Sequence, residues 1–196
     1  GVRFDTSGSD PQRPAPVNST FSQTFSACAY ALRALMDRDL PVNDGFYRFV
    51  KLNAPPGTVT HAVHPGAVVG GWETAVRVND LIFKALASAL PEAVPAGTKA
   101  MQCQAGFGVP EPGGEYNCFY EAIAGGYGGR AHRDGPDAVQ AHGQNTENAP
   151  VEETEAKHAV RITRYELLPD SDGPGKYRGG LGLRRIITPV GHTCVF

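Results

Sequence analysis

Glycine and proline constrain the fold of this chain more than any other feature of its sequence. The chain holds 24 glycines and 16 prolines among 196 residues, about a fifth of its length, against roughly 12% in an average protein. Both residues interrupt regular structure, so we expect short elements joined by many loops rather than a helical bundle. The glycines follow no three-residue period, which excludes a collagen-like chain.

Two stretches have the length and pattern of long helices. From Phe21 to Met36 the apolar residues recur three and four positions apart, which predicts a helix over about 19–37 with Asn18 or Ser19 as its N-cap. Residues 72–90 contain no glycine or proline and are apolar around most of the helical circumference. This pattern predicts a second helix, and a buried one.

The remaining regular segments read as strands. Three prolines exclude a helix over 7–18, and Glu152, Glu153 and Glu155 suit the first turns of a short helix beginning near Val151. Alternating or short apolar runs predict strands at 2–5, 46–52, 101–107, 117–124, 160–168 and 183–190. Strands outnumber helices without a regular strand–helix rhythm. The predicted fold class is therefore α+β, with mixed or antiparallel strands and two main buried helices, and we expect residues 1–196 to form a single segment of a larger domain.

The charge balance and hydropathy exclude two classes of partner. Eighteen basic and 20 acidic residues give a net charge of −2, which leaves no basic surface for nucleic acid. No apolar run approaches the roughly 18 residues of a membrane span, and the first residues show no signal-peptide pattern. We expect a cytoplasmic protein.

The cysteines do not indicate a disulfide framework. Cys28, Cys103, Cys118 and Cys194 contain no CxxC spacing and are few for a chain of this length. Free cysteine usually packs as a small apolar residue, so we interpret all four as buried thiols.

Several common catalytic devices are missing from the sequence. GGYGGR does not satisfy G-x-G-x-x-G because residue 131 is alanine, and no GK[ST] motif is present, so the sequence predicts neither nucleotide-binding loop. A G-x-S-x-G elbow is also missing. His61 and His64 form a close pair in a loop but have no third ligand nearby, and we assign no metal to them.

The most distinctive polar segment follows a glycine run. Gly125, Gly126, Gly128 and Gly129 surround Tyr127, a composition that permits unusual backbone angles or close approach to another surface. A polar cluster comes next and comprises His132, Asp134, Asp137, His142, Gln144, Asn145, Glu147, Asn148, Glu152, Glu153 and Glu155. Such residues can transfer protons and orient a carbonyl group. They also stabilise loops and cap helices, so both interpretations stay open.

The sequence resembles the hydantoinase B/oxoprolinase family in blocks that follow the family's order over nearly the whole chain. The blocks are DTSGSDPQ, APVNSTFSQTFSACAYALRALM, PVNDGFYRFVKLNAPPGT, AVVGGWETAVRV, the glycine run with RDG, HGQNTENAPVEETE and RYELLPDSDGPGKYRGGLGL. The resemblance implies a B-type subunit of an enzyme that uses ATP, bound on a hydantoinase-A-like partner, to activate a cyclic amide such as a hydantoin, 5-oxoproline or another lactam. It also implies a divalent metal held by an N-terminal region that precedes these residues, together with further segments of the B-type protein.

In that setting, the polar segment supplies the candidate site residues. His142 would transfer a proton, Asn145 and Asn148 would orient a carbonyl group, and Glu152 would act as a base or a helix cap. Arg130 would pair with a carboxylate or phosphate. The glycines at 125, 126, 128 and 129 would let the backbone approach the substrate or a partner.

Two other functions remain open at this point. The chain also resembles the B-type subunits of acetone and acetophenone carboxylases, and it could instead be a structural docking module whose catalytic groups lie elsewhere. The sequence does not choose among hydantoin, oxoproline, other lactams and ketones as substrates.

Overall fold

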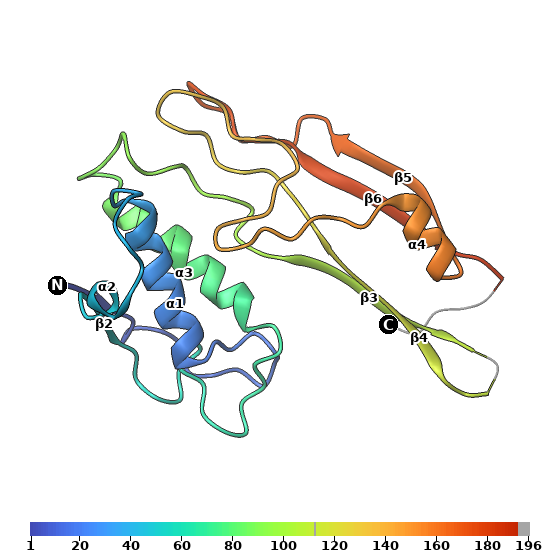
Figure 1. Ribbon diagram of the computed structural model, residues 1–196, viewed down its shortest axis with the longest axis horizontal. Helices are drawn as coiled ribbons and strands as arrows, with labels where there is room; N and C mark the ends of the chain where they lie inside the picture. Colours follow the sequence, from blue (N-terminus) through green and yellow to red (C-terminus); the bar gives the residue numbers. More distant parts are fainter. Residues whose placement is uncertain (112, 192–196) are drawn as a thin grey trace. The chain divides into compact units, whose positions relative to one another are not determined.

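The computed structural model describes residues 1–111 and 113–191, which form two compact units. Unit 1 comprises Gly1–Met101 and unit 2 comprises Gln102–Phe196 (Figure 1). Helices and strands occur together in both units, which confirms the predicted α+β class. No helix in the described ranges is both long enough and apolar enough to cross a membrane.

Unit 1 is built on two helices that pack side by side (Figure 1). Its elements are β1 (Val2–Asp5), α1 (Phe21–Ala34), α2 (Asp44–Tyr47), β2 (Val50–Asn53) and α3 (Gly71–Leu86). β1 and β2 form a parallel pair. Buried side chains of α1, α2, β2 and α3, among them Cys28, Phe46, Val50 and Val78, form the core. The two predicted long helices are therefore confirmed, with shorter bounds. The expectation that α3 is buried all round is wrong in unit 1, because only one side of it faces the core and Leu81 is 57% exposed.

The N-cap of α1 was predicted one or two residues too early. Thr20 is the cap, and its side-chain oxygen accepts a hydrogen bond from the Gln23 N–H at 3.2 Å. Asn18 is fully buried and fixes the preceding loop instead. Its oxygen accepts from the Arg13 N–H, and its amide nitrogen lies 2.8–2.9 Å from three carbonyl oxygens, including that of Ala67. Asn18 is therefore committed to loop contacts and does not cap the helix.

The predicted strand over 46–52 is wrong in its first part. Phe46 lies in α2, where the Asn43 side chain accepts a hydrogen bond from its N–H at 3.3 Å. This cap favours a helical turn, which buries the Phe46 ring in the core. The strand β2 begins only at Val50.

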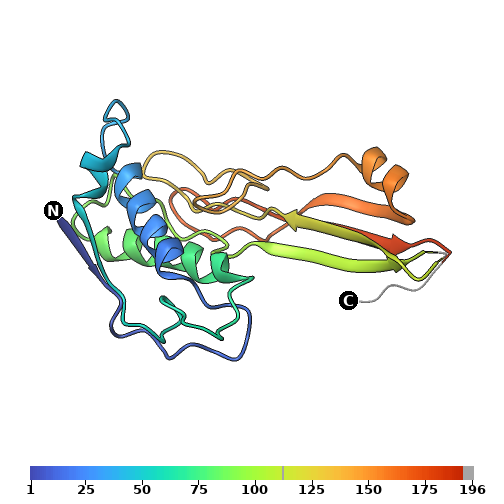
Figure 2. The same cartoon turned by 60° about the horizontal axis from the view of Figure 1, so that its bottom comes forward.

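Unit 2 consists of two antiparallel hairpins and a short helix. β3 (Cys103–Pro110) pairs with β4 (Tyr116–Ile123), and β5 (Val160–Leu168) pairs with β6 (Gly182–Pro189). The two hairpins run along each other (Figures 1 and 2). α4 (Val151–Lys157) packs against β5, and the side chain of Asn117 on β4 donates to the Lys157 carbonyl at the end of α4. The four strands and the helix were all predicted within a few residues.

The ladder between β5 and β6 contains one irregularity. Ile162 pairs with Ile187 and Arg164 pairs with Ile186, so Thr163 is an extra residue in β5. Beyond this bulge, Tyr165 lies opposite Arg185 and Glu166 opposite Arg184. The bulge also explains why the apolar alternation of β5 stops after Ile162.

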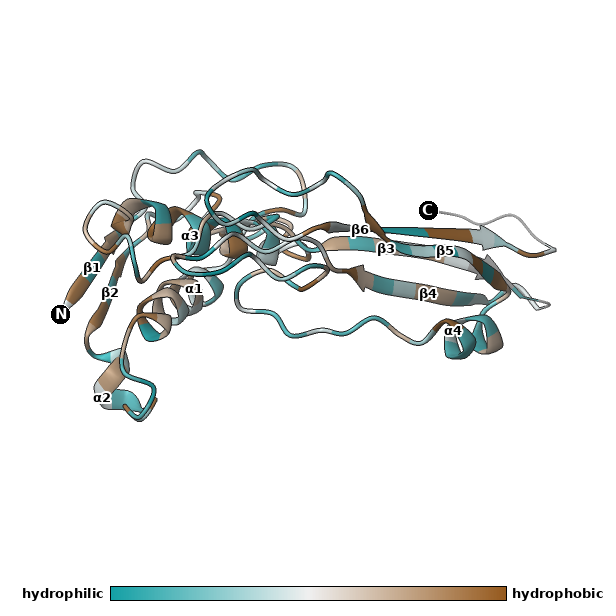
Figure 3. Cartoon of the chain, turned by 90° about the horizontal axis from the view of Figure 1, so that it is seen from above, coloured by the Kyte–Doolittle hydropathy of each residue, from teal (hydrophilic) through white to brown (hydrophobic). Residues whose placement is uncertain are grey.

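A buried ion pair joins the two hairpins. Hydrophilic and hydrophobic stretches succeed each other along β6 (Figure 3), and the hydrophilic stretch holds two arginines with different surroundings. Arg185 Nε lies 2.9 Å from Glu121 Oε2 on β4, and both side chains are at most 5% exposed. The Tyr165 ring covers the Arg185 guanidinium at 4.5 Å. The neighbouring Arg184 pairs with Glu166 at the surface.

The prediction that the cysteines are buried holds for one of the three that the structure describes. Cys28 is buried, whereas Cys103 and Cys118 are exposed on the β3–β4 hairpin. A two-stranded hairpin has only a small core, and both cysteines lie on strands with exposed neighbours. Cys194 lies outside the described residues.

Candidate functional site

The polar segment that follows the glycine run lines a cavity of about 350 Å³ in unit 2. Its walls come from the end of β4, the loop before α4 and β5. The lining residues are Ala124, Ala138, Val139, Gln140, Gln144, Asn145, Thr146, Glu147, Asn148 and Tyr165. Because four of them carry side-chain amides, we call this space the amide-lined cavity. Two of the predicted site residues, Asn145 and Asn148, lie in it.

Asn148 forms a fixed part of the cavity wall. Its amide nitrogen donates to the Ala122 carbonyl at 2.7 Å, and its amide oxygen accepts from the Tyr165 hydroxyl at 3.0 Å. Both halves of the amide are thus engaged between β4 and β5. Asn145, by contrast, is exposed at the edge of the cavity.

Two glutamines in the cavity wall have no such engagement. Gln140 is only 8% exposed, and its amide nitrogen and oxygen both lack a hydrogen-bond partner among the described residues. The same holds for both amide atoms of Gln144. A buried amide atom without a partner costs about 1–3 kcal/mol. Such a cost marks a place where a ligand can satisfy the unmet groups.

Gln144 belongs to the polar cluster predicted from the sequence, whereas Gln140 was not among the predicted site residues. Gln140 lies between Val139 and Ala141, in a short apolar run that connects two polar stretches. A single glutamine inside an apolar run is the signal that could have identified it, because buried polar side chains are uncommon and need partners.

His142 lies outside the cavity lining and contacts the glycine run. Its side chain is buried, and Nδ1 lies 2.7 Å from the Tyr127 hydroxyl oxygen. The two rings meet edge to face at 4.9 Å, and the Arg130 guanidinium lies 5.7 Å from the centre of the Tyr127 ring. Tyr127 therefore brings two predicted site residues together, and the proton-transfer role of His142 stays a prediction.

The glycines of the run pack against another loop of unit 2. A Cβ atom at Gly126 would lie 1.9 Å from the Gly180 carbonyl oxygen, and one at Gly129 would lie 2.5 Å from that of Tyr177. The Gly128 carbonyl oxygen faces Gly135 in the same way. None of the positive-φ glycines of the described chain lies in the run. Close backbone approach therefore explains Gly126 and Gly129, and the predicted contact of the run with substrate stays a prediction.

Glu152 is exposed in the first turn of α4 and is not among the residues that line the cavity. Its neighbour Glu153 pairs with Lys157 one turn later in the helix. The position of Glu152 suits an acidic residue near a helix N-terminus. Its predicted role as a base stays a prediction.

An ion-pair clamp holds the loop after the glycine run. Arg178 donates to both carboxylate oxygens of Asp137, at 2.8 and 3.3 Å, and the Leu181 N–H donates to the same carboxylate at 2.7 Å. The Arg178 side chain, followed by the Leu181 N–H, lowers the pKa of Asp137 below its ordinary value. The pKa of Arg178 is raised, mainly by its hydrogen bonds to Asp137.

We expect the clamp to make the stability of unit 2 depend on pH. A carboxyl group whose pKa is lower in the folded state stabilises that state above the unfolded pKa, near 3.9 for aspartate. This contribution is lost as the pH falls through the folded pKa. The destabilisation caused by Asp137→Asn should therefore be complete at neutral pH and shrink steadily below about pH 4, as measured by urea unfolding across pH. Asp170→Asn, at an exposed position with a left-handed backbone that asparagine also adopts, is the control. Equal destabilisation by Asp137→Asn at all pH values would contradict the clamp.

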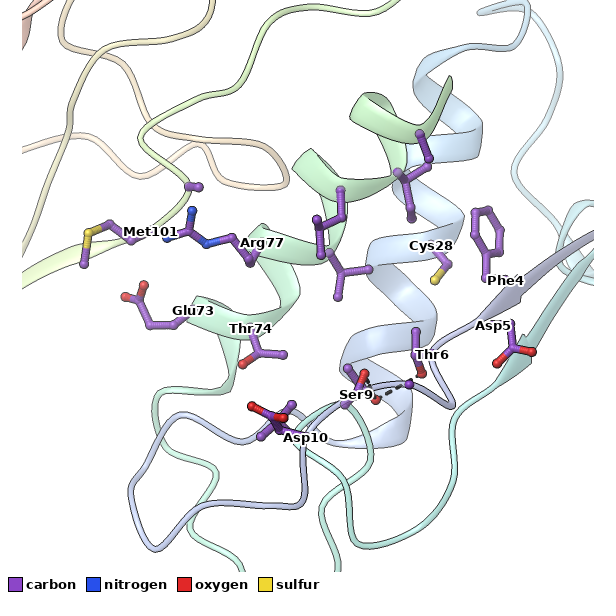
Figure 4. Close-up of a pocket in the computed structure, with 18 of the residues that line it drawn as sticks. Phe4, Asp5, Thr6, Ser9, Asp10, Cys28, Glu73, Thr74, Arg77 and Met101 are labelled. Atoms are coloured by element: carbon purple, nitrogen blue, oxygen red, sulfur yellow. Dashed lines mark hydrogen bonds between the residues drawn. The ribbon is translucent and has the colours of Figure 1, made fainter. Parts of the chain in front are cut away.

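A second cavity, of about 780 Å³, lies in unit 1 between β1, α1 and α3 (Figure 4). Three of its hydroxyl groups are already paired with one another: the Thr60 hydroxyl lies 3.0 Å from that of Thr6 and 3.4 Å from that of Ser9. Hydrogen bonds from Ser7, and then from Asn53, lower the pKa of Asp5. Burial raises the pKa of the Cys28 thiol to about 11, so Cys28 is not a thiolate nucleophile at neutral pH. We therefore take the amide-lined cavity as the candidate site.

The structure gives His61 a structural role. His61 Nδ1 lies 2.7 Å from the Ala54 carbonyl oxygen, and its ring lies 5.1 Å from that of Phe21. Over residues 1–111 and 113–191, no three histidine, cysteine or acidic side chains come close enough together to hold a metal ion. The described residues thus do not fit a metal site, and we derive no step through one.

Comparison with known proteins places this architecture in a defined class. The sequence model of the family described as Hydantoinase B/oxoprolinase matches residues 1–194. The chain therefore belongs to the hydantoinase B/oxoprolinase family, as its sequence blocks indicate.

Three similar proteins are informative. An uncharacterised protein of Methanocaldococcus jannaschii, MJ0963, is 40% identical over 94% of this chain, and the putative B-type subunit of a D-/L-hydantoinase from a Pseudomonas species is 34% identical over 95%. The crystal structure of an ATP-dependent caprolactamase from Pseudomonas jessenii matches 95% of this chain with a TM-score of 0.80 and 27% identity. The chain spans about a third of each of these proteins: 32% of the first two and 33% of the third.

Proposed function

We propose that this chain is a segment of the B-type subunit of an ATP-dependent hydrolase of cyclic amides, which acts with a hydantoinase-A-like, ATP-binding partner. The observation that carries this proposal is the family match over residues 1–194. Two of the similar proteins are named for a hydantoinase and a caprolactamase, and both names refer to cyclic amides. The first is named as one subunit of its enzyme and the second as ATP-dependent, which supports a partner chain and a nucleotide.

The chemistry explains why two subunits would share the reaction. The amide carbonyl of an unstrained ring is a poor electrophile, and transfer of a phosphoryl group from ATP to its oxygen makes the carbon reactive toward water. The sequence contains neither of the two phosphate-binding motifs considered above, which supports placing ATP on the partner. The B-type protein would then hold the ring and shield it from side reactions, a role that suits a cavity lined with amide groups.

We expect the full B-type protein, assembled with its A-type partner, to release ADP only when a cyclic amide is present. Hydantoin, 5-oxoproline and ε-caprolactam are the test compounds, and the readouts are ADP formation and the ring-opened acid, since hydrolysis yields one acid for each amide opened. Acetone with bicarbonate is the control for the carboxylase alternative. ADP release that requires bicarbonate and a ketone would overturn the proposal.

The same assay separates catalysis from docking. If His142 transfers a proton in the reaction, His142→Ala should lower turnover by more than about tenfold. Glu152→Ala tests the exposed carboxylate in the same way. Full assembly with turnover kept within tenfold in both variants would assign this segment to docking instead.

A further inference from the structure

Gln140 and Gln144 determine which hydrogen-bonding groups a ligand of the amide-lined cavity must offer. Each has a donor and an acceptor in its side-chain amide, and neither atom of either residue has a partner in the described structure. Asn148 has already used both of its amide atoms. A ligand in this cavity therefore meets one rigid amide, that of Asn148, the two glutamine amides that are available for pairing, and the exposed amide of Asn145 at the edge.

A carboxamide is matched best by a group that offers an acceptor and a donor side by side. A small ring holds its amide bond in the cis form, so the ring C=O and N–H point in the same direction. Such an amide can accept a hydrogen bond from Nε2 and donate one to Oε1 of the same glutamine. An N-alkylated ring lacks the donor and leaves Oε1 unsatisfied.

The charge of the cavity disfavours the carboxylate that ring opening creates. Glu147 lies in the lining, and no lysine, arginine or histidine does. A carboxylate in the cavity would therefore meet a like charge and glutamine oxygens that need donors. The lining suits a neutral ring amide better than the acid formed from it.

The position of Gln140 is supported by the backbone beside it. Ala138, beside the glutamine loop, adopts a left-handed φ of 52°, a conformation that costs energy in a residue with a side chain. Its N–H donates to the Leu181 carbonyl at 3.0 Å, next to the Asp137–Arg178 clamp. The loop that carries Gln140 is thus held at a defined place.

We infer that Gln140 and Gln144 recognise the cis amide of the substrate ring by paired hydrogen bonds, so that the amide-lined cavity selects the closed ring over its hydrolysis product. The assignment of this ligand as the substrate rests on the proposed function; the binding preference rests on the cavity alone.

The test is calorimetric titration of the full protein with δ-valerolactam, its N-methyl derivative and the N-acetylated ring-opened acid, which carries the new carboxylate without an ammonium group that Glu147 would attract. The wild-type protein should bind the lactam at least about tenfold more tightly than either analogue. Gln140→Met and Gln144→Met, which keep the side-chain length, should each weaken lactam binding by about tenfold. Because the ring carries a single N–H, the variant that removes the glutamine accepting from it should also lose the preference over the N-methyl derivative. Gln104→Met, at an exposed position of β3, is the matched control.

A second readout separates recognition from a structural role. Replacing an unsatisfied buried amide by an apolar side chain should raise the urea midpoint of the unliganded protein while binding weakens. Gln140→Glu, which keeps the shape but loses the amide donors, should also weaken binding and covers the case in which a methionine variant misfolds. Unchanged lactam affinity in folded variants, or equal wild-type affinity for the lactam and its N-methyl derivative, would overturn the inference. If the glutamine variants open cyclic amides with the wild-type KM, this inference is overturned and the proposed function stands. If the lactam binds in a glutamine-dependent way but is not turned over, the proposed function is overturned and this inference stands.

Discussion

Arg185→Leu is expected to lower the unfolding free energy of unit 2 by about 3–5 kcal/mol. The substitution leaves the Glu121 carboxylate, 5% exposed, without its counter-charge between the two hairpins. It also removes the guanidinium that lies against the Tyr165 ring and donates to the Ala149 carbonyl. Urea unfolding followed by hydrogen exchange of the β4 and β6 amides measures the loss in unit 2 without assuming that the whole protein unfolds in one step.

The neighbouring strand position provides the control. Arg184 pairs with Glu166 at 3.0 Å, but both side chains are more than 40% exposed. Arg184→Leu should therefore cost less than about 1 kcal/mol. The double variant Arg185→Leu with Glu121→Leu should recover much of the loss, because no isolated charge remains buried. If Arg185→Leu and Arg184→Leu lowered the unfolding free energy by the same amount, burial would not determine how much the Arg185–Glu121 pair contributes to stability.

Gly180→Ala is expected to destabilise unit 2 by about 3 kcal/mol or more. The added methyl group would lie 1.9 Å from the Pro136 carbonyl oxygen and 3.1 Å from the Asp137 nitrogen. Neither atom belongs to a flexible side chain, so the backbone of one of the two loops has to move. We expect the shift to disturb the Asp137 clamp as well, and hydrogen exchange at the Leu181 and Ala138 amides reports it directly.

Gly173 provides the matched control for this variant. It lies in the same loop, has an ordinary φ, and no atom lies within 4 Å of the position that its Cβ would occupy. Gly173→Ala should leave stability unchanged or raise it slightly, because alanine restricts the unfolded chain. If the two alanine variants were equally stable, the backbone contact between the loops could not be as close as the structure has it.

The elements with strong local patterns were predictable from sequence. α3 begins and β1 ends where the apolar pattern and the breakers place them, because these elements depend on periodicity along a short stretch. The N-cap of α1 was not predictable in this way, since Asn18, Ser19 and Thr20 all carry a suitable oxygen. The choice depends on Ala67, a residue 49 positions away that engages Asn18.

The candidate site shows the same limit. The glycine run and the polar cluster are visible in the sequence, and both lie in the same unit. Their partners are not local: Gly126 faces Gly180, and Asn148 bonds to Tyr165. Gln140 is buried in a loop that is held by a distant residue, since the Ala138 N–H donates to the Leu181 carbonyl, so spacing along the chain could not reveal it.

The extra residue in β5 determines which charges meet across the hairpin. In an uninterrupted ladder continuing from Ile162 opposite Ile187, Thr163 would face Ile186, and Arg164 would face Arg185. Two guanidinium groups would then compete for one buried carboxylate. The bulge at Thr163 instead brings the Tyr165 ring to Arg185. The hairpin thereby selects against its own misalignment, because the simpler alignment is electrostatically the worse one.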